Sequence, residues 1–239
     1  MAVLEFGTFG MNRRMEVRRL GDPMRAIPAA VRAAMCPIVF DSEVIVARGR
    51  TTVWVHDLMG ACHVRLSQKP FGHRIAECAR LMRALRRATP ASARDPASVQ
   101  ILRKGWWPAH QAGLVIKDPR NADRDGLIFA PYSGTYVIGV DHTLLKWKLH
   151  NTVDFMVSDA GVLLLMDSLP ADAGEILLNM EDRWKGCVVE AAWDYEQNGW
   201  VAMHSRADKP RANNRETYID TKQAIAERVT EEDVLAAVA

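Results

Sequence analysis

The hydrophobic and polar residues of the chain follow two periods, one typical of strands and one typical of a helix. Residues 37–47 and 51–58 are rich in Val and Ile, and Arg48-Gly49-Arg50 between them suits a hairpin turn. Within residues 73–87 the apolar side chains recur every three or four positions, which predicts an amphipathic helix. A loop over residues 89–98, opened by Thr-Pro, is expected to follow this helix.

Short strand-like segments dominate the remainder of the sequence. They lie at residues 3–8, 15–19, 99–104, 127–130, 143–149, 152–157, 162–166, 187–193 and 200–204. Helices are expected at residues 29–34, 216–228 and 231–238, the last opened by a capping-box-like pair, Thr230 and Asp233. Because the strands after Asn151 are short and separated by turns, they suggest a small β-barrel or sandwich. The pattern therefore predicts a mixed domain followed by a small β domain.

Composition narrows the classes of protein to which the chain can belong. Of its 239 residues, 49% are hydrophobic and 25% are charged, a balance typical of a core-forming protein. No apolar run approaches the roughly 20 residues that a membrane-spanning helix needs, and the N-terminus lacks the basic region of a signal peptide. The four cysteines form no Cys-x-x-Cys pair, which favours a reduced, intracellular protein without structural zinc. A net charge of +2 gives no overall signal for nucleic-acid binding.

Three groups of charged residues in the second half of the chain are candidates for chemistry. Asp125 stands at a turn just before a strand, a position from which a carboxylate can help to hold a metal ion. Lys146 and Lys148 share one face of the next predicted strand and could receive a phosphate group. Arg206-Ala207-Asp208-Lys209 supplies two cations and a carboxylate on a predicted loop. Taken singly, each group is also compatible with a simple turn, a solvated strand face or a surface ion pair.

The order and spacing of these groups resemble the motifs of covalent nucleotidyltransferases and, among them, of the GTP:mRNA guanylyltransferases (capping enzymes). The matched segments are, in chain order, Phe40-Asp41-Ser42-Glu43-Val44, Val53-Trp54-Val55-His56-Asp57-Leu58, Leu102-Arg103-Lys104-Gly105-Trp106-Trp107-Pro108, Asp125-Gly126-Leu127-Ile128-Phe129, Leu144-Leu145-Lys146-Trp147-Lys148 with Asn151-Thr152-Val153-Asp154-Phe155, and Trp200 through Arg206-x-Asp208-Lys209 to Asn213 and Thr217. The resemblance covers about residues 40–230. The Asn-Thr-Val-Asp-Phe tail and the Arg-x-Asp-Lys sequence are more similar to capping enzymes than to DNA or RNA ligases.

This resemblance implies an α+β chain of two domains. A nucleotidyltransferase domain with antiparallel sheets, incomplete at its N-terminus, would occupy residues 1–151, and an OB-fold β-barrel with C-terminal helices would occupy residues 152–239. The implied reaction transfers GMP from GTP, through a lysyl-GMP phosphoramidate, to 5′-diphosphate RNA. The implied partners, besides GTP and the 5′ end of nascent mRNA, are an RNA triphosphatase, a methyltransferase or RNA polymerase, with no membrane. The implied location is the nucleus or, for a viral protein, the nucleus, a cytoplasmic factory or the virion.

The resemblance also assigns roles to single residues of a nucleotide and metal site. Lys146 and Lys148 would hold the α-phosphate of GTP. His56 would stack on the purine, at a position where the family usually has an aromatic residue. Asp125 and Glu43 would contribute to the nucleotide site and would bind Mg²⁺ or Mn²⁺.

A second set of residues would act on the other phosphates. Arg206, Asp208 and Lys209 would close over the β- and γ-phosphates when the OB-fold domain swings in. His204 stands where the family usually has an arginine, and Ser42 where it has a glycine. Because phosphoryl transfer is governed by positioning and charge neutralisation, such a crowd of cations around the phosphates suits the chemistry.

The nucleophile of the family lies in a Lys-x-Asp-Gly motif, and this motif has no match in the chain. It is expected before Asp41, whereas the first lysine is Lys69. A nucleophilic lysine needs a site that lowers its pKa from about 10.4, so Lys69, Lys104 and Lys117 are poor substitutes. The interpretation is a guanylyltransferase whose sequence starts just downstream of its nucleophile. The alternatives are an inactive scaffold that binds GTP, capped RNA or the transcription machinery and, less favoured, an ATP-dependent polynucleotide ligase.

Overall fold

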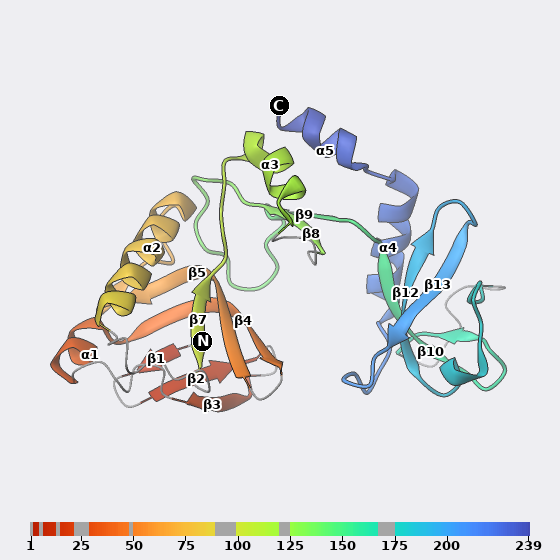
Figure 1. Ribbon diagram of the computed structural model, residues 1–239, viewed down its shortest axis with the longest axis horizontal. Coiled ribbons are helices and arrows are strands. Elements are labelled where there is room, and N and C mark those ends of the chain that lie inside the picture. Colours follow the sequence, from red (N-terminus) through yellow and green to blue (C-terminus); the bar gives the residue numbers. More distant parts are fainter. Residues whose placement is uncertain are drawn as a thin grey trace. The chain divides into compact units, whose positions relative to one another are not determined.

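The computed structural model of the chain describes residues 2–4, 7–12, 15–21, 29–47, 50–88, 99–119, 125–166 and 175–239 (Figure 1). The chain divides into two compact units. The first unit comprises Met1–Trp107 and Phe129–Leu145, and the second comprises Pro108–Ile128 and Lys146–Ala239. Each unit has a hydrophobic core of its own. The expected domain division after residue 151 stays a prediction.

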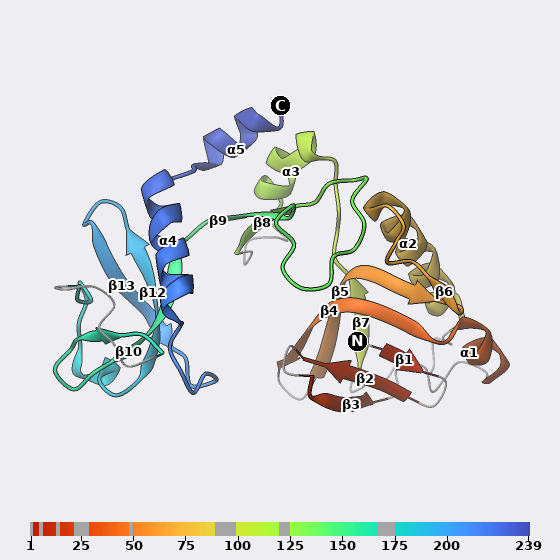
Figure 2. The ribbon, with the colours of Figure 1, turned by 180° about the vertical axis from the view of Figure 1, so that it is seen from behind.

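A seven-stranded sheet forms most of the first unit (Figures 1 and 2). Its strands are β1 (Ala2–Leu4), β2 (Gly7–Met11), β3 (Val17–Gly21), β4 (Ile38–Ala47), β5 (Arg50–Ala61), β6 (Val64–Arg65) and β7 (Gln100–Arg103). The order is β3-β2-β1-β4-β5-β6, and β7 pairs with β5 beside this path. The β5–β7 pair is parallel, and the pairs along the main path are antiparallel.

The helices of the first unit are α1 (Ala29–Met35) and α2 (Phe71–Ala88). Cys78, Leu81 and Leu85 form a buried stripe along α2 at three- and four-residue spacing. They share one core with Phe40 of β4 and Val55 of β5. The hydrophobic periodicity that predicts α2 is therefore also what packs it against the sheet and fixes the β4–β5 hairpin.

A four-stranded antiparallel sheet forms the centre of the second unit. Its strands are β10 (Thr152–Val157), β11 (Leu163–Leu164), β12 (Val188–Asp194) and β13 (Gly199–Ser205), in the order β11-β10-β12-β13. A separate two-stranded ribbon pairs β8 (Gly126–Phe129) with β9 (Leu145–Lys148). The helices are α3 (Ala112–Lys117), α4 (Arg215–Glu227) and α5 (Glu231–Ala237), with short 3₁₀ helices η2 (Ala109–Gln111) and η4 (Asp182–Trp184).

Aromatic side chains fill the core of the second unit. The ring of Phe155 lies edge-on to those of Trp200 and Tyr218, with centroid distances of 5.1 and 6.0 Å. Tyr218 belongs to α4, which thereby packs against the sheet. The predicted capping box is confirmed, since Thr230 and Asp233 exchange side-chain to backbone hydrogen bonds at the start of α5.

The α+β class with antiparallel sheets is confirmed, and several elements differ from the prediction; β6, for example, has only two residues and was not predicted. The segment predicted as one strand over residues 3–8 divides into β1 and β2, because the chain reverses and Leu4 pairs with Gly7. The strand expected at residues 162–166 is reduced to β11. Helix α3 was not predicted, since six residues contain too few turns to show a period.

Two predicted connections, the turn at residues 48–49 and the loop at 89–98, lie outside the described residues. In the part of the chain that the structure describes, none of the helices has the length and apolarity needed to cross a bilayer.

Candidate functional site

The hairpin of β4 and β5 carries the predicted site residues of the first unit. In its register Asp41 pairs with Asp57 and Ser42 pairs with Val55, so that His56 is the extra residue of a β-bulge. Bulges re-aim a side chain and are common beside active sites. The sequence therefore places His56 at a break in the regular ladder, next to the strand that carries the predicted acid.

Glu43 and His56 are both influenced by Lys104, which was not predicted as a site residue. The Nζ atom of Lys104 lies 3.5 Å from Oε2 of Glu43. The backbone N–H of Lys104 donates to the carbonyl of Val55 at 2.8 Å, which anchors it beside β5. Burial lowers the pKa of His56 below its usual value, and the positive charge of Lys104 lowers it further. The imidazole is therefore held neutral near pH 7, the form that can stack on a base without carrying a charge.

A buried ion pair with Asp57, the neighbour of His56, connects this hairpin to α2. Arg74 of α2 donates from Nε to both carboxylate oxygens of Asp57 at 3.0 Å and from Nη2 to Oδ2 at 2.7 Å. Its Nη1 donates to the carbonyl of Gly134 at 3.0 Å, so Arg74 ties β5, α2 and the segment after β8 together. That segment brings the hydroxyl of Tyr136 to 3.0 Å from Oδ2 of Asp41. Burial, together with Asp41, raises the pKa of Tyr136 to about 12.

In the second unit, the Asp-Gly pair is joined to the strand of the two lysines. The N–H of Leu149 donates to the carbonyl of Asp125 at 2.9 Å. Gly126 has a φ of +154°, and a Cβ atom there would stand 2.0 Å from the carbonyl oxygen of Trp147. Only glycine fits this close approach of β8 to β9. The Asp-Gly sequence thus sets the position of Asp125 relative to Lys148.

The two lysines of β9 repel each other. Lys148 is exposed as a residue, but its ammonium group is partly buried, and this burial lowers its pKa. The positive charge of Lys146 lowers the pKa of Lys148 further. The carboxylates of Asp125, Glu190 and Asp154 act in the opposite direction. A phosphate bound between the two ammonium groups would relieve their repulsion, so this pair suits an anionic ligand.

Arg206, Asp208 and Lys209 form connected ion pairs with two acids of the sheet. Arg206 donates to Asp208 from Nε at 2.9 Å and from Nη2 at 2.8 Å. Its Nη1 donates to Glu190 at 3.0 Å and to Asp154 at 3.3 Å. Lys209 donates from Nζ to the other oxygen of Asp154. The hydrogen bond with Asp208, assisted by the other carboxylates, raises the pKa of Arg206, while Arg206 lowers the pKa of Asp208 to about 2.

The predicted site residues therefore fall into two sets. The set in the first unit contains Glu43 and His56, and the set in the second unit contains Asp125, Lys146, Lys148, Arg206, Asp208 and Lys209. The suggested metal ligands Asp125 and Glu43 belong to different units. Among the described residues, no three His, Cys, Asp or Glu side chains form a group that could hold a metal ion.

Two acids, Asp154 and Glu190, organise the second set. The sequence analysis gives neither a role, although Asp154 stands in the matched Asn-Thr-Val-Asp-Phe tail. One signal could have found Asp154, namely a carboxylate between the apolar Val153 and Phe155 in the middle of a strand. An acid in that position is buried, and a buried carboxylate requires cationic partners. The sequence does not say which cations these are.

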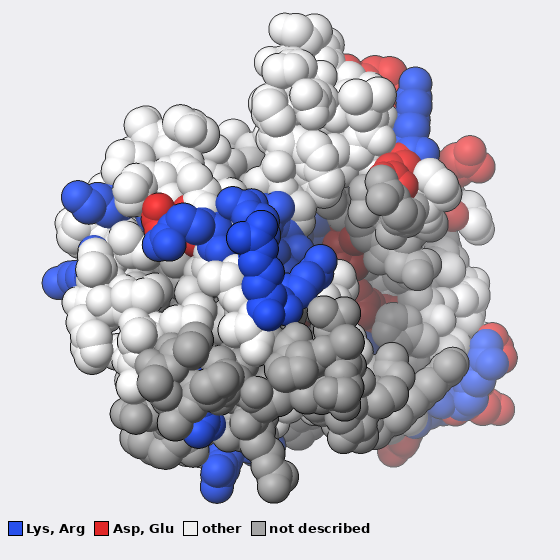
Figure 3. Space-filling model, turned by 60° about the vertical axis from the view of Figure 1, so that its left-hand side comes forward, with Lys and Arg blue, Asp and Glu red and all other residues white. Residues whose placement is uncertain are grey.

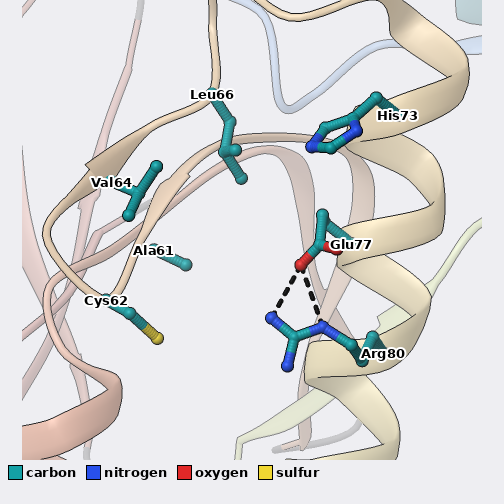
Figure 4. Close-up of a pocket in the computed structure, with 7 residues that line it drawn as sticks. All are labelled: Ala61, Cys62, Val64, Leu66, His73, Glu77 and Arg80. Carbon is teal, nitrogen blue, oxygen red and sulfur yellow. Dashed lines mark hydrogen bonds and ion pairs between the residues drawn. The ribbon is translucent and has the colours of Figure 1, made fainter.

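Two cavities border the β5–β6 hairpin. One of about 180 Å³ lies between this hairpin and α2, with apolar side chains on the hairpin side and His73, Glu77 and Arg80 on the helix side (Figure 4). The other, of about 490 Å³, is lined chiefly by the hairpin and by Ile138. Neither cavity is lined by a predicted site residue.

The solvent face of α2 is strongly basic. Arg80, Arg83, Arg86 and Arg87 are exposed on the side of the helix opposite its buried stripe. Arg80 pairs with Glu77 at 2.7 Å, whereas the other three have no carboxylate partner in the part of the chain that the structure describes. Figure 3 shows Lys and Arg side chains gathered on one face.

The sheets and helices of the chain have the predicted fold class, a nucleotidyltransferase-type α+β fold with an OB-fold domain and C-terminal helices. The family model of the mRNA capping enzyme catalytic domain matches residues 1–150, and that of the mRNA capping enzyme C-terminal domain matches residues 163–235. The chain belongs to the mRNA capping enzyme family.

Solved structures that align with the chain include DNA ligases. A mycobacterial DNA ligase D complexed with ATP and MES is 15% identical, with 87% of this chain and 85% of that chain covered and a TM-score of 0.49. The ligase domain of LigD from M. tuberculosis has the same identity and coverage and a TM-score of 0.42. A Lig E DNA ligase is also 15% identical, with 85% and 90% of the chains covered and a TM-score of 0.36.

Proposed function

We propose that this chain acts as the guanylyltransferase of mRNA cap formation, transferring GMP from GTP through a lysyl-GMP intermediate to the 5′-diphosphate end of RNA. The observation that carries the proposal is the pair of cationic groups in the second unit. Lys146 and Lys148 repel each other on β9, and Arg206 and Lys209 are gathered on Asp154. One group suits the α-phosphate and the other suits the terminal phosphates.

The chemistry requires these groups to stabilise negative charge. When a nucleophile attacks the α-phosphorus, charge develops on the oxygens of the transferred group and of the departing pyrophosphate. In this proposal, Lys146 and Lys148 bind the α-phosphate, the group that is transferred. Arg206 and Lys209 would bind the pyrophosphate, whose departure they favour by offsetting its charge. His56, held neutral by burial, is proposed to stack on the guanine.

The carboxylates of Asp125 and Glu43 are the proposed ligands of Mg²⁺ or Mn²⁺. Mg²⁺ is usually held by one or two carboxylates together with substrate phosphates and water, so an exposed carboxylate beside a phosphate-binding lysine fits this ion. Asp125 is such a carboxylate, since it is exposed and adjoins the strand of Lys148. When bound, the ion would neutralise charge on the phosphates.

The lysines of the first unit do not offer the nucleophile. The ammonium group of Lys104 lies against the carboxylate of Glu43, and Lys69 is exposed to solvent. The proposal therefore needs a lysine in the Lys-x-Asp-Gly motif, which these 239 residues do not contain. A second function follows if no such lysine acts with the chain. The site would then bind GTP or RNA without forming a covalent intermediate, and His56 and His204 in place of the usual family residues favour that alternative.

The basic face of α2 supports RNA as the acceptor. Its exposed arginines stand on one side of an 18-residue helix, and three of them have no acid partner among the described residues. The phosphate backbone of RNA can bind along such a row of cations without a pocket for its bases. An RNA that follows this face is the proposed second substrate.

The test is incubation of the chain with α-³²P-labelled GTP and Mg²⁺ or Mn²⁺, followed by denaturing electrophoresis. We expect no label on the chain alone, label after a segment carrying Lys-x-Asp-Gly is joined to its N-terminus, and no label when Lys148→Gln is added. Label on the unextended chain would locate the nucleophile among its own lysines. Binding of GTP without label in the extended chain would favour the non-catalytic alternative, and labelling by ATP in preference to GTP would favour a ligase.

A further inference from the structure

Asp154 is a buried carboxylate of the second unit to which the proposed function assigns no step of the reaction. It lies within β10 with 4% of its surface exposed. Its backbone N–H donates to the side-chain oxygen of Asn213 at 2.7 Å, and its carbonyl accepts from the N–H of Asn213 at 2.8 Å. Two hydrogen bonds with Asn213 thus fix the Asp154 backbone. A carboxylate in such a place is tolerated only when cations compensate its charge.

A second acid stands directly opposite Asp154. In the antiparallel pair of β10 and β12, Asp154 is the register partner of Glu190. Like charges that face each other across two strands are destabilising. Arg206 removes this repulsion, because its Nη1 donates to both carboxylates, at 3.3 and 3.0 Å. Lys209 binds the remaining oxygen of Asp154. Asp154 and Glu190 therefore hold the two cations that follow β13, and we refer to this pair of carboxylates as the acid cradle.

The two edges of the Arg206 guanidinium face different surroundings. Its Nη1 edge meets Asp154, whose side chain is 5% exposed, and Glu190, whose side chain is 23% exposed. Its Nε and Nη2 atoms hold Asp208, whose side chain is 65% exposed. A planar fork of two N–H groups binds phosphate in the same bidentate way as it binds carboxylate. The acid cradle thus directs the fork of Arg206 toward solvent.

We propose that Asp154, assisted by Glu190, is the positioning residue that orients Arg206 and Lys209 for the β- and γ-phosphates of the nucleotide. This inference rests on the proposed function. Asp154 is not expected to touch the substrate. It acts through the two cations, fixing the direction of the Arg206 fork and the position of the Lys209 ammonium group. A terminal phosphate would replace Asp208 on the exposed edge while the buried edge stays on the cradle.

Simple electrostatics and positioning predict opposite effects when Asp154 is neutralised. Removal of a negative charge makes the surroundings of the two cations more positive, which by itself would tighten the binding of an anion. Loss of the cradle, in contrast, lets both side chains rotate away and restores to them the conformational freedom that binding must then remove. The sign of the change in GTP affinity therefore decides between two roles of Asp154. Tighter binding would mean that its carboxylate competes with phosphate for the two cations, and weaker binding would mean that it positions them.

The experiment measures binding of GTP and GMP to the whole chain by calorimetry in the presence of Mg²⁺, for wild type and Asp154→Asn. GMP lacks the β- and γ-phosphates, so the ratio of the two affinities isolates the contribution of Arg206 and Lys209. We expect Asp154→Asn to lower the GTP-over-GMP preference by about tenfold, the value of one charge-assisted hydrogen bond, and to leave GMP affinity unchanged. The matched control is Asp159→Asn, the same substitution at an exposed turn of the same unit.

A mutant cycle distinguishes positioning from a general effect on the fold. In a chain that already carries Arg206→Gln and Lys209→Gln, we expect Asp154→Asn to change the preference no further. The inference would be overturned if the single variant kept or increased the GTP-over-GMP preference, or if it lost GTP and GMP affinity equally. An additive effect in the triple variant would overturn it as well. If Asp154→Asn does not fold, Glu190→Gln replaces it, with a smaller loss expected and an unaltered preference as the contradicting result.

The proposed function and this inference fail in different ways. A folded wild-type chain that shows no preference for GTP over GMP would contradict the proposed function itself. A preference that Arg206→Gln abolishes, but that survives both Asp154→Asn and Glu190→Gln, would contradict only the positioning role.

Discussion

Arg74 shows how one side chain can connect elements that sequence patterns treat separately. It is 3% exposed and binds Asp57 of β5 while its Nη1 donates to the carbonyls of Lys69 and Gly134. These contacts hold α2, the sheet and the segment before Tyr136 in one arrangement. Because Tyr136 contacts Asp41 and Asp57 adjoins His56, the candidate site of the first unit depends on this buried ion pair.

Asp57→Asn should therefore destabilise the first unit strongly. The substitution leaves the Arg74 guanidinium buried with an incomplete partner, and breaking such a pair costs about 3–5 kcal/mol. Urea unfolding with a probe of the first unit would measure the loss. Glu77→Gln is the control, since its ion pair with Arg80 is exposed and contributes little to stability. Equal effects of the two variants would show that burial does not set the strength of the pair.

The cysteines should differ in reactivity according to burial. Cys78 is fully buried, and burial raises the pKa of its thiol to about 11, so little thiolate forms at neutral pH. Cys36 is buried as well, whereas Cys62 is exposed. With a maleimide at pH 7, we expect Cys62 to be modified first, and Cys36 and Cys78 only after unfolding. Peptide mapping after timed quenching would measure the order, and modification of Cys78 as fast as Cys62 would contradict it.

At the residue scale the sequence predicts which side chains are candidates but not which ones pair. The order of the charged groups is enough to single out Lys146, Lys148 and Arg206. The contact of Arg206 with Asp154 spans 52 positions and depends on the register of three strands. Lys104, 61 positions from Glu43, is likewise brought to it only by the parallel pairing of β7 with β5. Such contacts depend on tertiary structure, and a local pattern does not contain them.

At the element scale the β8–β9 ribbon depends on Gly126. Gly126→Ala would force a Cβ atom against the carbonyl oxygen of Trp147, a backbone atom that cannot move without shifting β9. We expect a loss of stability above about 1 kcal/mol and, because β9 carries Lys146 and Lys148, weaker binding of GTP. Chemical unfolding and calorimetry measure the two effects.

Gly139→Ala is the control for the Gly126 prediction. Gly139 also has a positive φ, of +105°, but a Cβ there would meet nothing within 4 Å. This variant therefore contains the backbone strain without the clash. If the two variants lose equal stability and GTP affinity, the close approach of β8 to β9 is not what requires glycine.

The arginines of α2 provide a second prediction at the same scale. Arg83→Gln combined with Arg87→Gln should weaken the binding of single-stranded RNA and reduce the slope of log K against log salt concentration by about 1.4, or about 0.7 for each cation. Fluorescence anisotropy over a salt series would measure it. Arg18→Gln with Arg183→Gln removes the same charge at exposed sites elsewhere and serves as control. An unchanged slope in the α2 variant would remove this face from the RNA path, and binding of an acidic peptide instead would assign it to a protein partner.

Elements with a strong local signal were predicted well, and the others were not. Helix α2 is long, and its buried stripe repeats over several turns, so its period is clear. Only two residues separate β1 from β2 in the sequence, too few to interrupt the apolar pattern. β11 has two residues and α3 has six, lengths at which neither a strand nor a helical period can be recognised.

At the scale of the whole molecule, the two hydrophobic cores predict two unfolding steps. The first core is built around β4, β5 and α2, and the second around β10, β12, β13 and α4. A chain with two separate cores need not unfold as one cooperative unit. Asp57→Asn should lower the first unit's transition alone, and Phe155→Ala, which removes about 3–5 kcal/mol from the second core, should lower only the other.

Hydrogen exchange followed by mass spectrometry during urea titration would assign each transition to its peptides. Coincident movement of both transitions in either variant would mean that the units unfold together. Separate movement would also make the GTP measurements more informative. A variant of the Asp154 cradle could then be compared with wild type at a denaturant concentration where the second unit is shown to be folded, so that a loss of GTP preference would report on Arg206 and Lys209 rather than on unfolding.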